Sequence, residues 1–143
     1  MKINAEIIGT DKIVGLLKQR LSILEDRSKL ALEKVGAALW KESVERVPRD
    51  TGNLARSAGM RFADRPHFKS YAVVFFRMEY AVYVHENVNE KWKGKNRPKT
   101  KQGESRGTYW DNGRSKYLES AWRDNVNELQ DIARAVMWKG LSG

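Results

Sequence analysis

"VPRDTGNLARSA", residues 47–58, determines where the chain ends one helix and changes direction. Pro48 disfavours the α conformation at the residue before it, so a helix that arrives from the N-terminal side ends there. Asp50 or Thr51 can cap a short second helix, because either side chain can accept a hydrogen bond from a first-turn amide. Gly52 permits a tight backbone path between the two. The stretch is therefore predicted to be a compact corner between a long helix and a short one.

Upstream of the corner, apolar residues recur at spacings of three and four, which is the pattern of an amphipathic helix. They are Ile13, Leu17, Leu21, Leu24, Ala31, Val35 and Leu39. The pattern predicts a helix that begins at a cap on Thr10 or Asp11 and ends near Arg46. At 1.5 Å per residue such a helix is about 50 Å long. A globule of this size cannot cover that length, so the helix either breaks near "LEDRS" (24–28) or packs partly on another subunit.

Alternating apolar residues predict strands on both sides of this helix. Residues 3–7 alternate before it, and residues 58–64 and 71–78 form two further strands joined by a loop. Because residues 71–78 are apolar on both faces, that strand is expected to be central in its sheet. Residues 79–87 are predicted to form a short helix, with a strand as the open alternative.

A second amphipathic helix is predicted from Tyr117 to about Lys139, stopped by Gly140. The predicted fold is a single α+β domain over residues 1–143, in which a small antiparallel sheet packs against a long N-terminal helix and a C-terminal helix. Residues 88–116 have no apolar periodicity and are predicted to form a long, flexible basic loop within it.

Composition narrows the kind of protein. The 143 residues contain no cysteine, which excludes disulfides, thiolate metal sites and cysteine nucleophiles and suits a reducing compartment. Glu6 interrupts the apolar run that a signal peptide needs, and no stretch is long enough to span a membrane. We therefore expect a soluble protein that is not exported by that route and has no membrane contact.

The net charge of +9 is concentrated in one segment, since residues 89–116 hold nine basic and three acidic residues. Within it, "KWKGKNRPKTK" (91–101) places a basic residue at every second position. These residues are Lys91, Lys93, Lys95, Arg97, Lys99 and Lys101. Three interpretations remain open: a solvated loop, contact with an acidic protein surface, and contact with DNA phosphates. Between the last two, protein contact is preferred.

Candidate chemistry is sparse. His85 and Glu86 could act as an acid–base pair or bind a metal, yet no zinc or dyad spacing accompanies them, and a structural role is preferred. Neither a cofactor nor a metal is expected. Four aromatic residues on apolar helical faces are expected to pack in the core, although one of the tryptophans could instead anchor a subunit interface. They are Tyr80, Tyr83, Trp122 and Trp138.

The corner resembles the signature Pro-x-Asp-Thr-Gly-x-Leu-x-x-Ser of a family of small tailed-phage virion proteins. Members are called neck, head-tail joining, tail-completion or minor capsid proteins. The matching residues are Pro48, Asp50, Thr51, Gly52, Leu54 and Ser57.

Two later segments extend this resemblance over roughly residues 10–137. The family follows its strands with a Tyr-Ala-x-x-Val-His/Glu-like segment, and it commonly ends with an (F/Y)L-x-x-A helix after a variable loop. The first is matched by Tyr80, Ala81, Val84, His85 and Glu86, and the second by Tyr117, Leu118 and Ala121. One departure is Asn87, where the family often has glycine.

The resemblance implies a non-enzymatic structural protein that assembles into a ring at the head-tail junction, for head closure or tail attachment. It implies portal or adaptor proteins and tail proteins as partners, with DNA in the channel as a further contact of the basic loop. The protein would be made and assembled in the bacterial host cytoplasm and end in the virion. The alternative is a small basic nucleic-acid-binding protein, or a ribonuclease-like enzyme that uses His85 and Glu86.

Overall fold

The computed structural model describes residues 9–88, 93–105, 107–109 and 113–139. In chain order the elements are α1 (Thr10–Arg46), α2 (Asn53–Arg56), β1 (Ala58–Ala63), β2 (Tyr71–Phe76), α3 (Ala81–Glu86) and α4 (Tyr117–Trp138). This α+β arrangement confirms the predicted fold class. The strand predicted at residues 3–7 lies outside the described residues.

Helix α1 runs without a break through "LEDRS", so the first alternative for this helix is wrong. Its start also differs from the prediction. Gly9 takes the N-cap position with φ 100°, and both Thr10 and Asp11 already lie inside the helix. At the other end Val47 is extended, as expected of a residue before proline.

Strands β1 and β2 form an antiparallel pair in which Met60 faces Val74 and Phe62 faces Ala72. The prediction that β2 is central is wrong for the described residues, where it pairs with β1 alone. The sheet closes onto α1 at Gly36. A Cβ there would lie 3.0 Å from both the Ala72 Cβ and the Met60 Sδ, so a side chain at this position would press on both residues.

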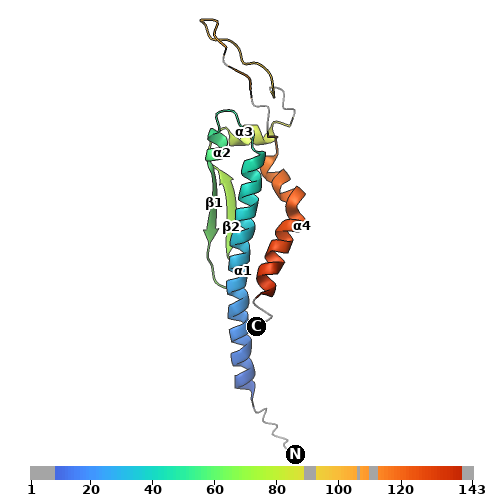
Figure 1. The fold of residues 1–143 in the computed structure, drawn as a ribbon. Coiled ribbons are helices and arrows are strands. Elements are labelled where there is room, and N and C mark those ends of the chain that lie inside the picture. Colours follow the sequence, from blue (N-terminus) through green and yellow to red (C-terminus); the bar gives the residue numbers. More distant parts are fainter. Residues whose placement is uncertain (1–8, 89–92, 106, 110–112, 140–143) are drawn as a thin grey trace, which may run out of the picture.

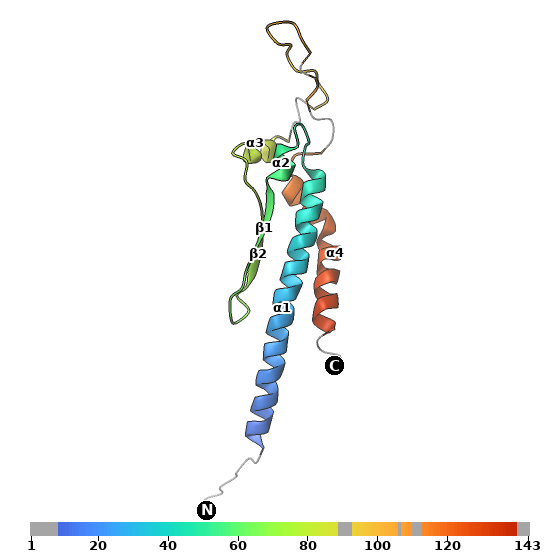
Figure 2. The same ribbon diagram turned by 60° about the vertical axis from the view of Figure 1, so that its left-hand side comes forward.

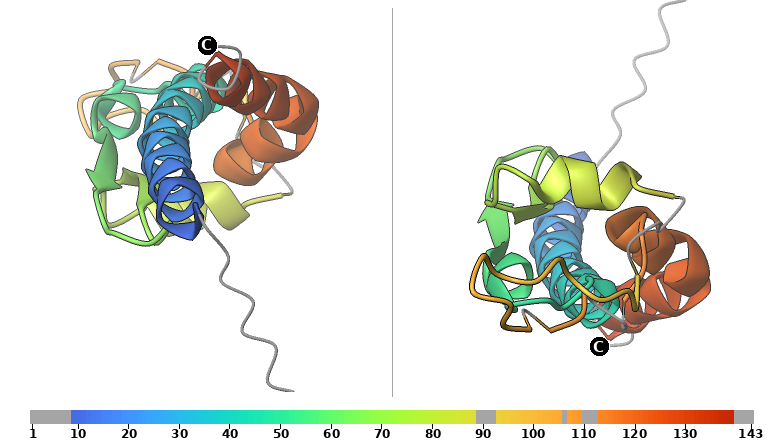
Figure 3. Two further views of the ribbon diagram at one scale, coloured as in Figure 1. Left: turned by 90° about the horizontal axis from the view of Figure 1, so that it is seen from below. Right: turned by 90° about the horizontal axis from the view of Figure 1, so that it is seen from above.

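The molecule is a rod built around α1 (Figure 1). The two-stranded sheet lies along one side of α1 and α4 packs along another, as the views from below and above confirm (Figure 3). The N-terminal part of α1 projects beyond the ends of both, and the basic loop projects from the opposite end (Figure 2). In the part of the chain described here, none of the helices is long and apolar enough to cross a membrane.

The main buried cluster lies at the loop end of the rod, where the corner, α3 and the start of α4 meet. It consists of Val47, Leu54, Ala81 and Tyr117, with Ala55, Phe76, Met78, Val84 and Leu118 packed around it. The middle and the projecting end of α1 lie outside this cluster, so the best-packed part of the molecule is at one end.

Candidate functional site

The three segments that resemble the phage family meet in this buried cluster. Leu54 comes from the corner, Ala81 from the second segment and Tyr117 from the third. The Tyr117 hydroxyl donates a hydrogen bond to the Ala81 carbonyl oxygen at 3.1 Å, and the Tyr117 ring packs edge-on against Phe76 with centroids 4.8 Å apart. Residues separated by more than sixty positions in the sequence thus form one packed unit.

The polar residues of the corner are arranged differently from the prediction. Gly52 is the N-cap of α2, with φ 77°, and Thr51 Oγ1 accepts only a long hydrogen bond (3.4 Å) from the Asn53 amide. Asp50 does not cap the helix; it forms an ion pair with Arg97 in the basic loop. Ser57 closes the corner locally, because its hydroxyl donates to the Leu54 carbonyl oxygen at 2.7 Å.

His85 and Glu86 are joined to the start of α4. His85 Nδ1 lies 2.8 Å from Glu86 Oε1, and Glu86 Oε2 lies 2.5 Å from Lys116 Nζ. The His85 ring packs edge-on against Tyr117, with centroids 4.9 Å apart. The Nε2 atom of His85, which a general base would present to a substrate, is buried from solvent.

The pKa shifts in this group all point away from neutrality. Hydrogen bonds from Lys116 and His85 lower the pKa of Glu86, and the bond to Glu86 raises the pKa of Lys116. Burial raises the pKa of Tyr117 to about 12. A general acid or base works best with a pKa near the working pH. These directions favour a structural role for Glu86, Lys116 and Tyr117. His85, Glu86 and Tyr117 line a pocket of about 230 Å³, together with Phe76 and Leu118.

The basic stretch does not form a single row of charges. Its stem is a narrow hairpin, in which Arg97 N donates to Gly107 O (2.9 Å) and Tyr109 N donates to Lys95 O (2.8 Å). Lys93 is turned inward and donates to the Gly113 carbonyl oxygen at 2.8 Å. Arg97 pairs with Asp50 and also lies over the Tyr109 ring.

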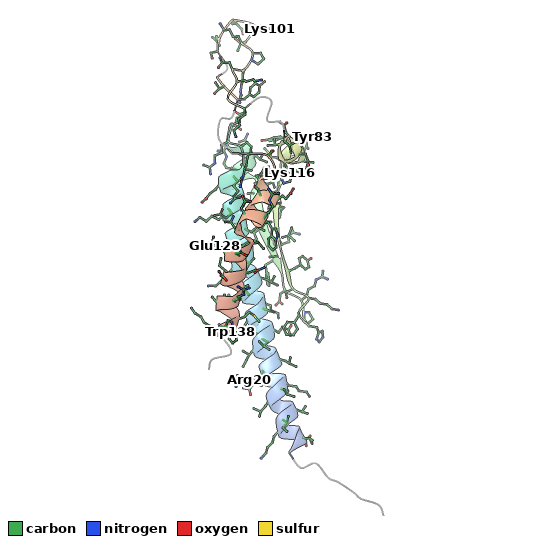
Figure 4. All side chains as sticks on the ribbon, turned by 90° about the vertical axis from the view of Figure 1, so that its right-hand side faces the viewer. Arg20, Tyr83, Lys101, Lys116, Glu128 and Trp138 are labelled. Carbon is green, nitrogen blue, oxygen red and sulfur yellow. The ribbon has the colours of Figure 1, made fainter. Side chains whose placement is uncertain are left out.

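Three basic residues of the stretch, Lys95, Lys99 and Lys101, are exposed, and Lys101 lies near the tip of the loop (Figure 4). Lys91 falls outside the described residues. Only part of the predicted contact set is thus available to a partner in this conformation.

An ionic network joins α1 to α4. The sequence alone did not suggest this network. Arg46 Nη1 lies 2.7 Å from Asp124 Oδ2 and 2.8 Å from the Ser120 carbonyl oxygen, and Arg114 Nη2 lies 2.6 Å from the same Asp124 oxygen. Both arginines lower the pKa of Asp124, Arg114 more strongly. Arg114 N also donates a hydrogen bond to Arg46 O. This bond holds the C-terminal end of the loop against the end of α1.

The prediction that four aromatic residues pack in the core is wrong. Tyr83 is 79% exposed, Trp138 66%, Trp122 51% and Tyr80 42%. Figure 4 shows Tyr83 pointing outward from α3. The uncovered apolar surface continues on the projecting part of α1, where Ile13, Leu16, Leu17 and Leu21 are each more than half exposed. Exposed apolar surface of this extent is typical of proteins that bind other proteins.

The acidic and histidine side chains are dispersed: within the described ranges no group of three or more is placed to hold a metal ion. No protein-family model, curated protein or solved structure matches this chain.

Proposed function

We propose that this protein is a structural component of a tailed-phage virion, assembling into a ring at the head-tail junction for head closure or tail attachment. The observation that carries this proposal is the meeting of the three motif segments in one core. Leu54, Ala81 and Tyr117 come from three separate segments of the resemblance and pack in one buried cluster. This shared core supports treating the three segments as one set of motifs.

The exposed apolar surface supports the oligomeric part of the proposal. A rod that leaves Trp122, Tyr83 and the projecting side of α1 in water gains stability when other subunits cover those surfaces. The two ends of the rod differ, since one carries the basic loop and the other the apolar end of α1. In a ring, these ends would meet different neighbours, with portal or adaptor proteins on one side and tail proteins on the other.

The basic loop is proposed to act as an assembly arm. Lys95, Lys99 and Lys101 are exposed on a projection whose base is secured by Arg97 and Lys93. Such a projection can contact an acidic portal or tail surface, or DNA in the channel. The ribonuclease-like alternative is less well supported, because the pKa of Glu86 is lowered and His85 Nε2 is buried.

The proposal is tested by electron microscopy of particles made by a phage with a stop codon in this gene. DNA-filled heads beside separate, finished tails indicate a role in joining, and heads that have lost DNA indicate a role in closure. The control is the same phage supplied with the intact gene on a plasmid. Normal infectious particles without the protein would overturn the proposal, and the purified protein would then be assayed for nuclease activity, with His85→Ala as its control.

A further inference from the structure

An open apolar groove runs along α1 beside α4. It comprises two pockets, of about 330 Å³ and 350 Å³, that share Trp122. The α1 side of the groove is formed by Ser28, Ala31, Leu32, Val35 and Leu39. On α4 the walls include Val126, Leu129, Ala133 and Met137, and Val74 of β2 contributes at the end where His85 of α3 closes the groove.

The same helical stripe continues out of the groove onto the part of α1 that stands clear of the molecule. We call residues 10–24 the projecting end. Its stripe residues keep the three-and-four spacing of the groove residues, so they lie on the same face of the helix. They are Thr10, Val14, Leu17, Leu21 and Leu24. Leu17 is 57% exposed and Leu21 54%, and Figure 4 shows the side chains around Arg20 extending into open space.

The stripe has the same spacing from either end. Steps of four, three and four lead from Thr10 to Leu21, and the same steps lead back from Leu39 to Ser28. Two copies of α1 placed antiparallel therefore bring the two stripes opposite each other over about 45 Å, taking residues 10–39 at 1.5 Å each. In that register Val14 lies opposite Val35 of the second copy, Leu17 opposite Leu32, and Leu21 opposite the small Ser28.

Charge favours the same pairing. The projecting end carries Lys12, Lys18 and Arg20 against Asp11, a net charge of +2. Helix α4 has four carboxylates and two arginines, a net charge of −2, although the protein is basic. Three of these carboxylates already pair with basic residues of the same chain: Glu119 with Lys116, Asp124 with Arg46 and Arg114, and Asp131 with Arg134. A basic helix laid beside α4 therefore meets a weakly opposite charge.

We propose that the occupant of the groove is the projecting end of a second copy of this chain, with the two α1 helices antiparallel. By symmetry each copy fills the groove of the other, which makes a closed two-fold dimer. Such a dimer keeps the apolar stripe from water before the protein meets its other neighbours. The contact does not depend on the proposed place in a virion.

The test uses the absence of cysteine from the chain. In the double variant Leu17→Cys/Leu32→Cys the two thiols are about 22 Å apart on one helix, too far for a disulfide within a chain. Any disulfide therefore joins two copies. We expect the purified protein to become a covalent dimer on mild oxidation. The matched control is Leu17→Cys/Glu33→Cys, because Glu33 is exposed next to Leu32 but points away from the stripe.

Equal cross-linking of the two variants would overturn the proposal. A second measurement is the mass of the uncross-linked protein by light scattering. The wild type should be a dimer, Leu21→Glu should be a monomer, and Ser22→Glu, on another face of the projecting end, should remain a dimer. A monomeric wild type overturns this contact and leaves the virion proposal standing, whereas normal particles without the protein overturn only the latter.

Discussion

Asp50 and Arg97 form an ion pair that joins the corner after α1 to the stem of the basic loop. One residue belongs to the motif that resembles the phage signature, and the other belongs to the alternating basic stretch. Asp50 therefore holds the loop rather than capping α2. Arg97, one of the basic residues of the alternating stretch, is paired within the molecule.

Arg97→Ala should loosen the loop without unfolding the protein. The half-exposed ion pair contributes no more than about 1 kcal/mol, so the thermal midpoint should change little. The stem amides of Arg97 and Tyr109 should exchange with deuterium faster, because their hydrogen bonds depend on the position of the stem. Lys99→Ala is the control, since Lys99 is exposed. Equal exchange in both variants would show that the pair does not hold the stem.

Tyr117→Phe should lower the free energy of unfolding by about 1 kcal/mol, the usual net value of one hydrogen bond, because the bond to Ala81 is lost. The effect should also depend on pH. Since the pKa of Tyr117 is raised to about 12 in the folded state, its stabilising contribution is present below about pH 10 and is lost as the pH rises toward 12. Urea titrations of both proteins at several pH values measure this. Tyr83→Phe, at an exposed site, should change neither quantity.

Asp124→Asn should make the protein less stable at neutral pH and less sensitive to acid. Arg114 and Arg46 lower the pKa of Asp124 in the folded state, so the charged form contributes stability above its ordinary pKa, and that contribution is lost as the pH falls through the folded value. Thermal midpoints between pH 7 and pH 3 should therefore converge for wild type and variant. Asp131→Asn, which removes only an exposed pair with Arg134, is the control. Parallel curves for Asp124→Asn and wild type would contradict the prediction.

Two glycines of α1 should respond oppositely to substitution. A Cβ at Gly15 meets nothing within 4 Å, so Gly15→Ala should raise helix stability by up to about 1 kcal/mol. Gly36→Val should destabilise the fold by about 1–3 kcal/mol, because the added atoms would press on Ala72 and Met60. Circular dichroism follows the first change and chemical denaturation the second. A stable Gly36→Val protein would mean that the sheet can move away from α1.

If the protein has the proposed virion role, reversing the exposed loop charges should reduce phage yield without affecting the fold. The triple change of Lys95, Lys99 and Lys101 to Glu places like charge against an acidic partner, and a loss of about 1.4 kcal/mol already corresponds to tenfold weaker binding. Arg97 and Lys93 are left unchanged because they hold the loop. Plaque assays of the variant phage measure the effect, with Lys34→Glu on α1 as the control. Full yield from the triple variant would exclude the loop as an assembly arm.

The order of elements could be predicted because it depends on local patterns. The spacing of Leu17, Leu21 and Leu24 predicts a helix whatever the rest of the chain does, and Pro48 ends it wherever it packs. The start of α1 could not be predicted, because Gly9 in the left-handed conformation occupies the cap position. Thr10 and Asp11 have the side chains typical of an N-cap, whereas Gly9 has no side chain that could accept a hydrogen bond.

The exposure of the aromatic residues could not be predicted from the sequence. An apolar helical face indicates that another surface covers it, but that surface can belong to the same chain or to another protein. Trp122 lies on such a face, yet the chain itself leaves it half exposed. Ion pairs between residues that are distant in the sequence could not be predicted either. Arg46 and Asp124 are 78 positions apart, and only the packing of α1 on α4 brings them within 2.7 Å.

Because the stem of the basic loop is paired, a short peptide can be inserted at the tip of the loop. Asn96 and Thr108 are bridged, Arg97 pairs with Asp50 of the corner, and Arg114 N donates to Arg46 O of α1. A short epitope inserted near Gln102 would therefore be displayed outward from a fixed base, leaving the corner and helices untouched. If the protein is the virion component proposed above, gold-labelled antibody against that epitope would mark its position on the particle.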